Sequence, residues 1–222
     1  MEIIPAIIPQ SYHELEAKAS RLVGLVKIIQ IDICDGVFVP SKSWPYNGSD
    51  HMFDEIKKEA QGLPSWNAFD YEVDLMVSRP EKVIDGWITA GASRIIIHIE
   101  STNSMDEVLG KLAGTVETGI ALSIDTPLEI IDALIGRIQF VQLMGIAKIG
   151  FQGQEFDTRV TARVRTLRQK YPALIISVDG GVTLDTAEAL LEAGVDRLVA
   201  GSAIWKSDNL GETIRQFHSL HT

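Results

Sequence analysis

Three aspartates lie late in short apolar segments, where a charged side chain needs a reason to be. Asp32 lies in IIQIDIC, Asp74 in YEVDLM and Asp179 in LIISVDGG. A carboxylate buried in apolar surroundings is costly unless it is paired, bound to a metal or protonated. One aspartate at a strand end often only caps the amides of a neighbouring loop. Three that converge on one end of a sheet favour a reactive site instead.

Glycines form a second group, again directly after apolar segments. They lie in GFQGQ (150–154), DGG (179–181) and GS (201–202). Glycine lets the backbone approach a ligand closely and turn its N–H groups toward it. A single Gly-Gly pair also occurs in plain turns. Three such loops after consecutive apolar segments predict a phosphate-binding site.

Two opposed carboxylates beside a phosphate cradle suit proton transfer at a carbon next to a carbonyl. One carboxylate removes the proton and the other returns it to the opposite face. The enediolate formed in between needs a metal ion or an oxyanion hole to stabilise it. The sequence therefore predicts acid–base chemistry on a small phosphorylated molecule.

Eight apolar segments alternate with eight amphipathic ones, and these must position the groups above. The apolar segments lie near 2–8, 26–34, 69–77, 94–100, 119–124, 138–145, 173–179 and 196–201. The amphipathic segments lie near 11–23, 50–60, 80–90, 104–114, 127–135, 157–170, 184–193 and 210–219. Ser11 with Glu14, and Thr126 with Glu129, have capping-box spacing. The alternation predicts parallel strands joined by helices, in an α/β fold of the closed (β/α)₈ TIM-barrel type. No linker is visible, so we expect one domain over residues 1–222.

The amino-acid composition limits the classes of binding partner and the cellular location that we expect for this chain. The formal net charge of −10 argues against nucleic acid, whose phosphate backbone an acidic chain repels. The one cysteine, Cys34, excludes an intrachain disulfide and is expected to pack rather than react. No apolar run is long enough for a membrane helix, and the N-terminus lacks a signal-peptide pattern. We expect a cytoplasmic protein that does not bind membranes.

Several stretches resemble the ribulose-phosphate 3-epimerase family over nearly the whole chain: IDICDGVFVP, VDLMVSRPE, AGASRIIIHIES, TPLE, VQLM with GFQGQ, VDGGV and VAGSAIW. The resemblance implies a TIM-barrel isomerase of the pentose phosphate pathway, which epimerises a pentulose phosphate at C3 through a 2,3-enediolate. It implies that Asp32 and Asp179 are the acid–base catalysts. The implied phosphate- and substrate-binding residues are Met144, Gly150, Phe151, Gln152, Gly153, Gly180, Gly181, Gly201 and Ser202.

The chain departs from the family pattern where that family binds a divalent metal through two histidines and the two aspartates. Gln30 and Asp74 stand at the histidine positions, and Ala6 stands where a serine is usual. The resulting set of Gln30, Asp32, Asp74 and Asp179 offers only oxygen ligands, which favours Mg²⁺ or Mn²⁺ over Zn²⁺. Without a metal the three carboxylates repel one another. Either Asp74 is protonated or a cation is bound, and the sequence leaves both open.

Other residues have two interpretations each. His98 either orients a substrate or packs inside the barrel. Lys148, after the sixth apolar segment, is either a Schiff-base lysine or, as we favour, a loop lysine or phosphate contact. We interpret the segment 42–48 (KSWPYNG) as a lid. The remaining histidines are expected in solvent: His13, His51, His218 and His221.

Three functions stay open at this level. The first is the sugar-phosphate epimerase described above, with a small phosphorylated sugar as its partner. The second is another isomerase, an aldolase or a decarboxylase on the same barrel. The third is a barrel without activity that binds a phosphorylated metabolite. Relatives of this barrel often self-associate, so a homo-oligomer is also expected.

Overall fold

The computed structural model describes residues 1–220, and within them eight strands form a closed barrel in the order β1-β2-β3-β4-β5-β6-β7-β8. The strand pairs are parallel, for example β2 with β3 and β7 with β8. The predicted (β/α)₈ barrel is therefore confirmed. The chain divides into two compact units, residues 6–118 and residues 1–5 with 119–222, and each is described by itself. His221 lies outside the described residues.

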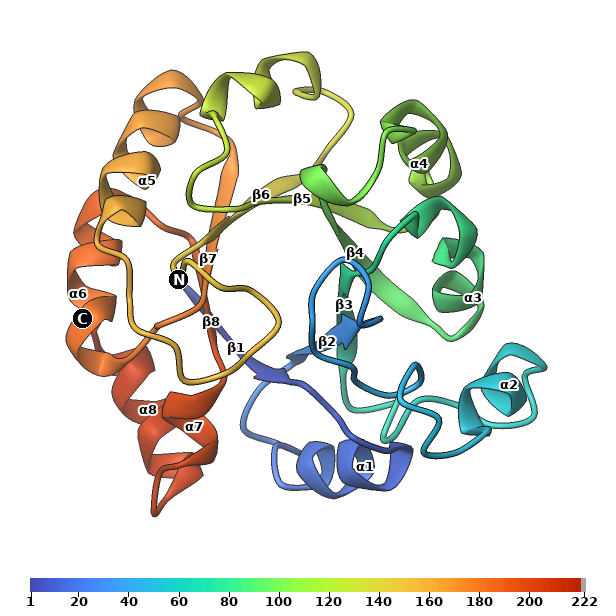
Figure 1. Cartoon of the computed structure of the whole chain (residues 1–222). Helices are drawn as coiled ribbons and strands as arrows, with labels where there is room; N and C mark the ends of the chain where they lie inside the picture. Colours follow the sequence, from blue (N-terminus) through green and yellow to red (C-terminus); the bar gives the residue numbers. More distant parts are fainter. Residues whose placement is uncertain (221–222) are drawn as a thin grey trace. The chain divides into compact units, whose positions relative to one another are not determined.

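The unit of residues 6–118 holds three complete strands with four α-helices on their outer side (Figure 1). The strands are β2 (Ile28–Cys34), β3 (Asp70–Met76) and β4 (Ala92–His98), and the helices are α1 (Tyr12–Ser20), α2 (Met52–Lys57), α3 (Ile84–Thr89) and α4 (Met105–Leu112). The last residues of β1 (Glu2–Ile7) pair with β2.

Strand register in this unit stacks polar side chains in two layers. Gln30 pairs with Glu72, and two residues further along Asp32 pairs with Asp74. Successive side chains of a strand point to opposite faces, so Gln30 and Asp32 share one face of β2. The opposite face of β2 carries isoleucines, including Ile31, that are fully buried. Both faces of β2 are thus covered, which explains why its sequence is almost continuously apolar.

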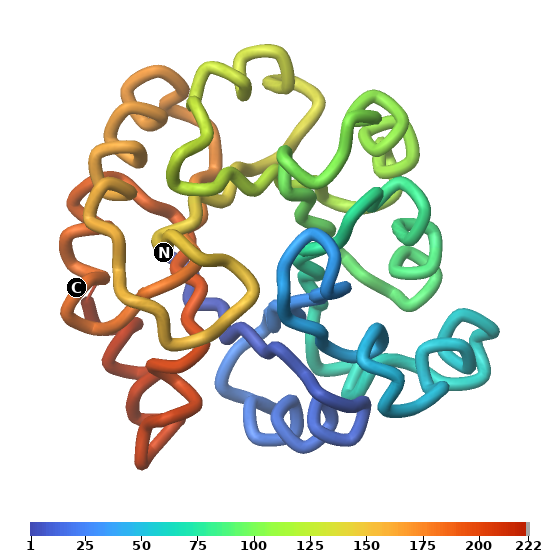
Figure 2. The backbone as a smooth tube through the Cα atoms, viewed as in Figure 1, coloured from blue at the N-terminus to red at the C-terminus, as the bar shows by residue number. Residues whose placement is uncertain are grey.

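The second unit contains the strands β6 (Phe140–Met144), β7 (Ile175–Asp179) and β8 (Arg197–Ala200), together with most of β5 (Glu117–Leu122). Its helices are α5 (Arg159–Lys170), α6 (Leu184–Ala193), α7 (Ser202–Trp205) and α8 (Leu210–Ser219). Gln142 pairs with Ser177, and Met144 pairs with Asp179. A long loop follows β6 and is drawn in gold in Figure 2.

Helix boundaries follow the sequence signals in part. Ser11 accepts a hydrogen bond from the Glu14 amide at the start of α1, as its spacing predicts. The helix predicted over 127–135 is instead a 3₁₀ helix, Leu128–Ala133, which follows Pro127 and has no side-chain cap. The prediction of a cap at Thr126 is therefore wrong, because Pro127 is itself the residue that precedes the first turn. The helix predicted over 80–90 is divided into a 3₁₀ turn (Pro80–Lys82) and α3.

No helix within residues 1–220 is both long enough and apolar enough to cross a membrane. The single domain expected over residues 1–222 stays a prediction.

The cap of α1 can be tested directly. Ser11→Ala removes the oxygen that accepts from the Glu14 amide, so we expect a loss of about 1 kcal/mol in the free energy of unfolding. Ser20→Ala is the matched control, because the exposed Ser20 hydroxyl donates only to the Ala17 carbonyl at the end of the same helix. Urea unfolding followed by circular dichroism measures both. Equal stability of the two variants would contradict the capping role.

Candidate functional site

Asp32 lies near the end of β2 and has a buried hydrogen-bond donor two residues earlier on the same strand. The Nε2 of Gln30 donates to Asp32 Oδ1 at 2.7 Å. Gln30 is fully buried and Asp32 nearly so. An ionised carboxylate only accepts hydrogen bonds, so the amide must present its nitrogen to Asp32 rather than its oxygen. The glutamine thus compensates part of the desolvation of the carboxylate.

Asp74, on β3, is paired with an imidazole from the next strand. The Nε2 of His98 lies 3.1 Å from Asp74 Oδ1, and both side chains are fully buried. The other ring nitrogen of His98 lies 4.0 Å from Glu100, and the Phe38 ring packs against the imidazole with centroids 5.4 Å apart. The structure therefore brings His98 and Asp74 together, while the role of His98 toward a substrate stays a prediction.

Asp179, at the end of β7, also has a glutamine beside it. The Nε2 of Gln142 donates to Asp179 Oδ2 at 3.4 Å, and the Ser177 hydroxyl donates to Gln142 Oε1 at 3.4 Å. The backbone carbonyl of Asp179 accepts from the Gly145 amide, which ties the end of β7 to the loop after β6. Gln142 and Ser177 are fully buried. Our sequence reasoning did not select Gln142, although it shares a strand face with Met144.

The loops that carry the predicted phosphate-binding glycines pack closely within the second unit. A Cβ added at Gly201 would lie 2.6 Å from Gln152 Nε2, so the side chain of Gln152 rests against the end of β8. Gly180, with a φ of 97°, lies under Ile146 in the same way. Segment 150–153 therefore contacts segment 201–202, while Gly180 packs against Ile146 in the loop after β6, and the phosphate interpretation stays a prediction.

A lysine side chain lies beside one of these glycines. The Nζ of Lys206 lies next to Gly153, because a Cβ placed on that glycine would be 3.3 Å from it. Lys206 follows the short helix α7, and its side chain is exposed. The only feature of the sequence that could have pointed to Lys206 is its position, four residues after the serine of VAGSAIW. Lys148, which the sequence analysis did consider, is exposed on the loop after β6.

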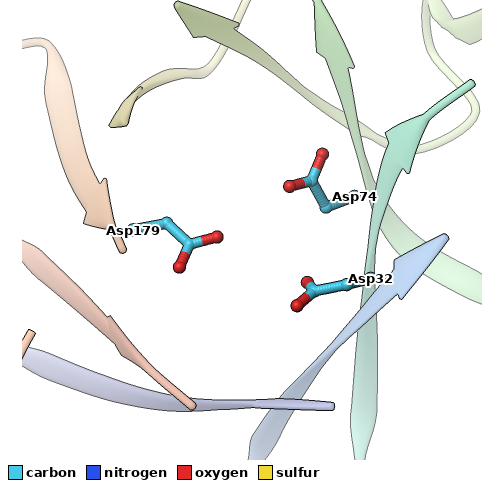
Figure 3. Close-up of side chains that lie close together, drawn as sticks. All are labelled: Asp32, Asp74 and Asp179. Atoms are coloured by element: carbon cyan, nitrogen blue, oxygen red, sulfur yellow. The ribbon is translucent and has the colours of Figure 1, made fainter. Parts of the chain in front are cut away.

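The three aspartates form a group of potential metal ligands. One carboxylate oxygen of each of Asp32, Asp74 and Asp179 lies within 4.8 Å of the other two (Figure 3). The group consists of oxygen donors alone, and hard divalent cations prefer such ligands. These residues fit a hard cation. Gln30 turns the nitrogen of its amide to Asp32, and its role as a metal ligand stays a prediction.

Cys34 lies at the end of β2 and is buried. Burial raises the pKa of its thiol to about 12, and the negative charges of Asp32 and Asp74 act in the same direction. The adjacent Ser43 hydroxyl accepts from the Cys34 amide and donates to the Asp32 carbonyl, so it holds the strand end. Cys34 is therefore a packing residue, as the sequence predicts.

The interpretation of segment 42–48 as a lid is wrong for Trp44. Trp44 is fully buried and packs against the rings of Tyr12, Phe53 and Trp87, which belong to α1, α2 and α3. Its indole nitrogen donates to Asp50 at 2.8 Å. Trp44 thus anchors the segment against three helices, and a sequence pattern of aromatic residues does not distinguish an anchor from a lid.

A family model described as the ribulose-phosphate 3 epimerase family matches residues 2–205. The chain belongs to the ribulose-phosphate 3-epimerase family. Among the ribulose-phosphate 3-epimerases it resembles are that of Schizosaccharomyces pombe, 30% identical over 96% of this chain and 90% of the relative, and the cytoplasmic isoform of Oryza sativa subsp. japonica, 31% identical over 96% and 91%. The ribulose-phosphate 3-epimerase of Bacillus subtilis is 26% identical over 97% of both chains.

Solved structures that resemble the chain show the fold alone, because their sequence identity is low. A 3-hexulose-6-phosphate synthase has a TM-score of 0.68 at 18% identity and covers 99% of both chains. KGPDC from Streptococcus mutans, in complex with D-R5P, has a TM-score of 0.69 at 13% identity and covers 99% of this chain and 96% of its own. These barrels carry different named activities, so membership of the ribulose-phosphate 3-epimerase family rests on sequence.

The thiol of Cys34 should be unreactive in the native protein. With its pKa at about 12 rather than 9.0, the thiol is almost entirely protonated at pH 8. Since the thiolate is the reacting species, alkylation by iodoacetamide should be about 10³-fold slower than for the unfolded chain. Mass spectrometry of native and urea-unfolded samples measures the two rates. Similar rates in both states would show that Cys34 is accessible and ionised.

Proposed function

We propose that this chain is a sugar-phosphate epimerase that inverts C3 of a pentulose phosphate through an enediolate. The observation that carries the proposal is the family match over residues 2–205, in a chain that has both Asp32 and Asp179. A decarboxylase activity is named for a structural neighbour, an orotidine 5′-phosphate decarboxylase from Pyrococcus horikoshii, but at 17% identity this likeness shows the fold alone. The exposure of Lys148 adds no support for a Schiff base, which requires a desolvated or otherwise activated amine.

Asp32 and Asp179 act as the proton-transfer pair in this proposal. One carboxylate takes the proton from C3, and the other delivers a proton to the opposite face of the enediolate. In the reverse direction the two exchange roles, as microscopic reversibility demands. Each is held by a buried amide donor, Gln30 or Gln142. The carboxyl group that delivers the proton enters the step protonated, and the other enters it ionised.

The phosphate group is assigned to the glycine loops of the second unit. Backbone N–H groups of Gly180, Gly181, Gly201 and Ser202 would bind its oxygens, since loops after the seventh and eighth strands are a frequent phosphate site in such barrels. Loop residues Gly150, Phe151, Gln152 and Gly153, with Met144 and His98, are proposed to contact the remainder of the sugar. The close packing of these loops supports the assignment.

A divalent metal fits the three carboxylates, and we favour Mg²⁺ or Mn²⁺ over Zn²⁺ because all donors are oxygens. Asp32, Asp74 and Asp179 would hold the ion. When bound, it would supply positive charge beside the oxygens on which the enediolate develops negative charge. Self-association of the chain and a cytoplasmic location stay predictions.

Solvent exchange tests the reaction. With ribulose 5-phosphate in D₂O, the protein should incorporate deuterium at C3, faster with Mg²⁺ or Mn²⁺ than with Zn²⁺ or EDTA. Asp32→Asn and Asp179→Asn should each slow the exchange at least about 10²-fold, because each removes one acid–base group. Asp208→Asn, at an exposed turn, is the control. Exchange under no condition would overturn the epimerase proposal, and full exchange in EDTA would overturn the metal requirement.

Lys206 tests the position of the phosphate. Its ammonium group lies beside Gly153, so Lys206→Ala should raise KM for the sugar phosphate about 3- to 10-fold. The kcat should change little, because the phosphate does not react and its binding is the same in the ground and transition states. Lys170→Ala, which removes an exposed lysine paired with Asp132, is the control. An unchanged KM would place the phosphate elsewhere.

A further inference from the structure

Two fully buried glutamines each lie one layer of side chains before a carboxylate, toward the start of the strands. Gln30 precedes Asp32 by two residues on β2, so the two side chains share one face of the strand. Gln142, on β6, pairs with Ser177, which precedes Asp179 by two residues on β7. Each glutamine therefore occupies the layer beneath an aspartate, and each directs its Nε2 to that aspartate.

We propose that Gln30 and Gln142 are positioning residues, which hold Asp32 and Asp179 through amide N–H donation, and that Gln30 does not ligate a metal. The proposal rests on the proposed epimerase function, because that function makes these two aspartates the proton-transfer pair. It replaces the interpretation of Gln30 as a ligand with one that follows from the contact the structure shows.

The geometry at Gln30 gives its amide nitrogen to Asp32, so the contact that the structure shows is that of a donor. An amide nitrogen has no lone pair available for a cation, so a glutamine ligates through its oxygen. The contact of 2.7 Å to Asp32 Oδ1 is made by the nitrogen. Turning the amide over would place its oxygen against a carboxylate oxygen at this distance, which is repulsive. A short bond to a charged acceptor is also stronger than a neutral one.

At Gln142 a hydrogen bond to the amide oxygen sets the orientation of the amide. The Ser177 hydroxyl donates to Gln142 Oε1, and this leaves Nε2 directed to Asp179. Both contacts are 3.4 Å, longer than the bond at Gln30, so the restraint on Asp179 is weaker. We therefore expect the two glutamines to contribute unequally, with Gln30 the more important.

A donor fixed to one carboxylate oxygen restricts rotation of the carboxylate and leaves its second oxygen to exchange the proton. Proton transfer depends steeply on the alignment of the reacting atoms. Loss of the donor should therefore lower kcat. Neither glutamine is assigned a contact with the substrate, so KM should be almost unaffected.

Methionine variants test this assignment, because methionine keeps the length of glutamine and removes its N–H donor. For Gln30→Met we expect kcat for epimerisation of ribulose 5-phosphate to fall about 10- to 30-fold, with KM within about 3-fold. For Gln142→Met we expect kcat to fall about 3- to 10-fold. Gln216→Met, at an exposed site on α8, is the matched control and should leave both constants unchanged.

Electron paramagnetic resonance of bound Mn²⁺ in H₂¹⁷O, without substrate, counts the water molecules on the ion and so separates positioning from ligation. If Gln30 is a donor only, the Gln30→Met variant keeps the wild-type number of Mn²⁺-bound waters, even though its affinity for Mn²⁺ falls because Asp32 has lost a donor. One additional water in the variant would make Gln30 a ligand and overturn the proposal. An unchanged kcat in Gln30→Met, with a wild type that turns over, would overturn its positioning role.

Failure of the proposed function is a separate result. A wild type without turnover would remove the epimerase assignment, while the count of Mn²⁺-bound waters would still decide whether Gln30 ligates. Circular dichroism checks that each variant is folded. If Gln30→Met does not fold, Gln30→Asn takes its place, since the shorter amide keeps polarity but does not reach Asp32, and the same losses are expected.

Discussion

The burial of carboxylates inside a parallel barrel is the constraint on which the rest of the structure depends. A carboxylate removed from water loses roughly several kcal/mol of solvation free energy unless hydrogen-bond donors or opposite charges replace the lost water. Each of the three aspartates has such a partner within its own unit. Gln30 serves Asp32, His98 serves Asp74, and the partner of Asp179 comes from the neighbouring strand β6.

Strand periodicity supplies these partners in a regular way. Because side chains alternate between the two faces of a strand, an aspartate late in a strand has its nearest same-face neighbour two residues earlier. On β2 that neighbour is Gln30, and on β3 it is Glu72, which in turn lies 3.6 Å from Arg94. Polar side chains therefore continue along β2 and β3 before the carboxylates of Asp32 and Asp74.

The sequence predicted well what depends on local periodicity. The eight strands and the closed barrel follow from apolar segments that alternate with amphipathic ones, and the prominence of Asp32, Asp74 and Asp179 follows from charge in an apolar segment. Pairings between strands were harder to predict. The contact of His98 with Asp74 depends on the register between β3 and β4, and this register cannot be read from a single sequence.

Gln142 and Trp44 show why the remainder was missed or misread. Gln142 sits in FVQLM, where one polar residue among apolar ones resembles a tolerated exception, and its importance appears only when β7 brings Asp179 beside it. Trp44 lies in a loop rich in aromatic residues. Its burial depends on rings from three helices that are far apart in the sequence. Both residues gain their meaning from neighbours that are distant in the chain.

The charge balance of the site connects these observations. When all three aspartates are ionised they carry three negative charges, and a divalent cation would neutralise two of them. Hydrogen-bond donors accommodate part of the residual charge, and the structure supplies amide N–H groups from two glutamines. An imidazole nitrogen of His98 also lies 3.1 Å from Asp74 Oδ1. A third carboxylate thus makes hydrogen-bond donors more necessary, and the amide nitrogen of Gln30 supplies one of them to Asp32.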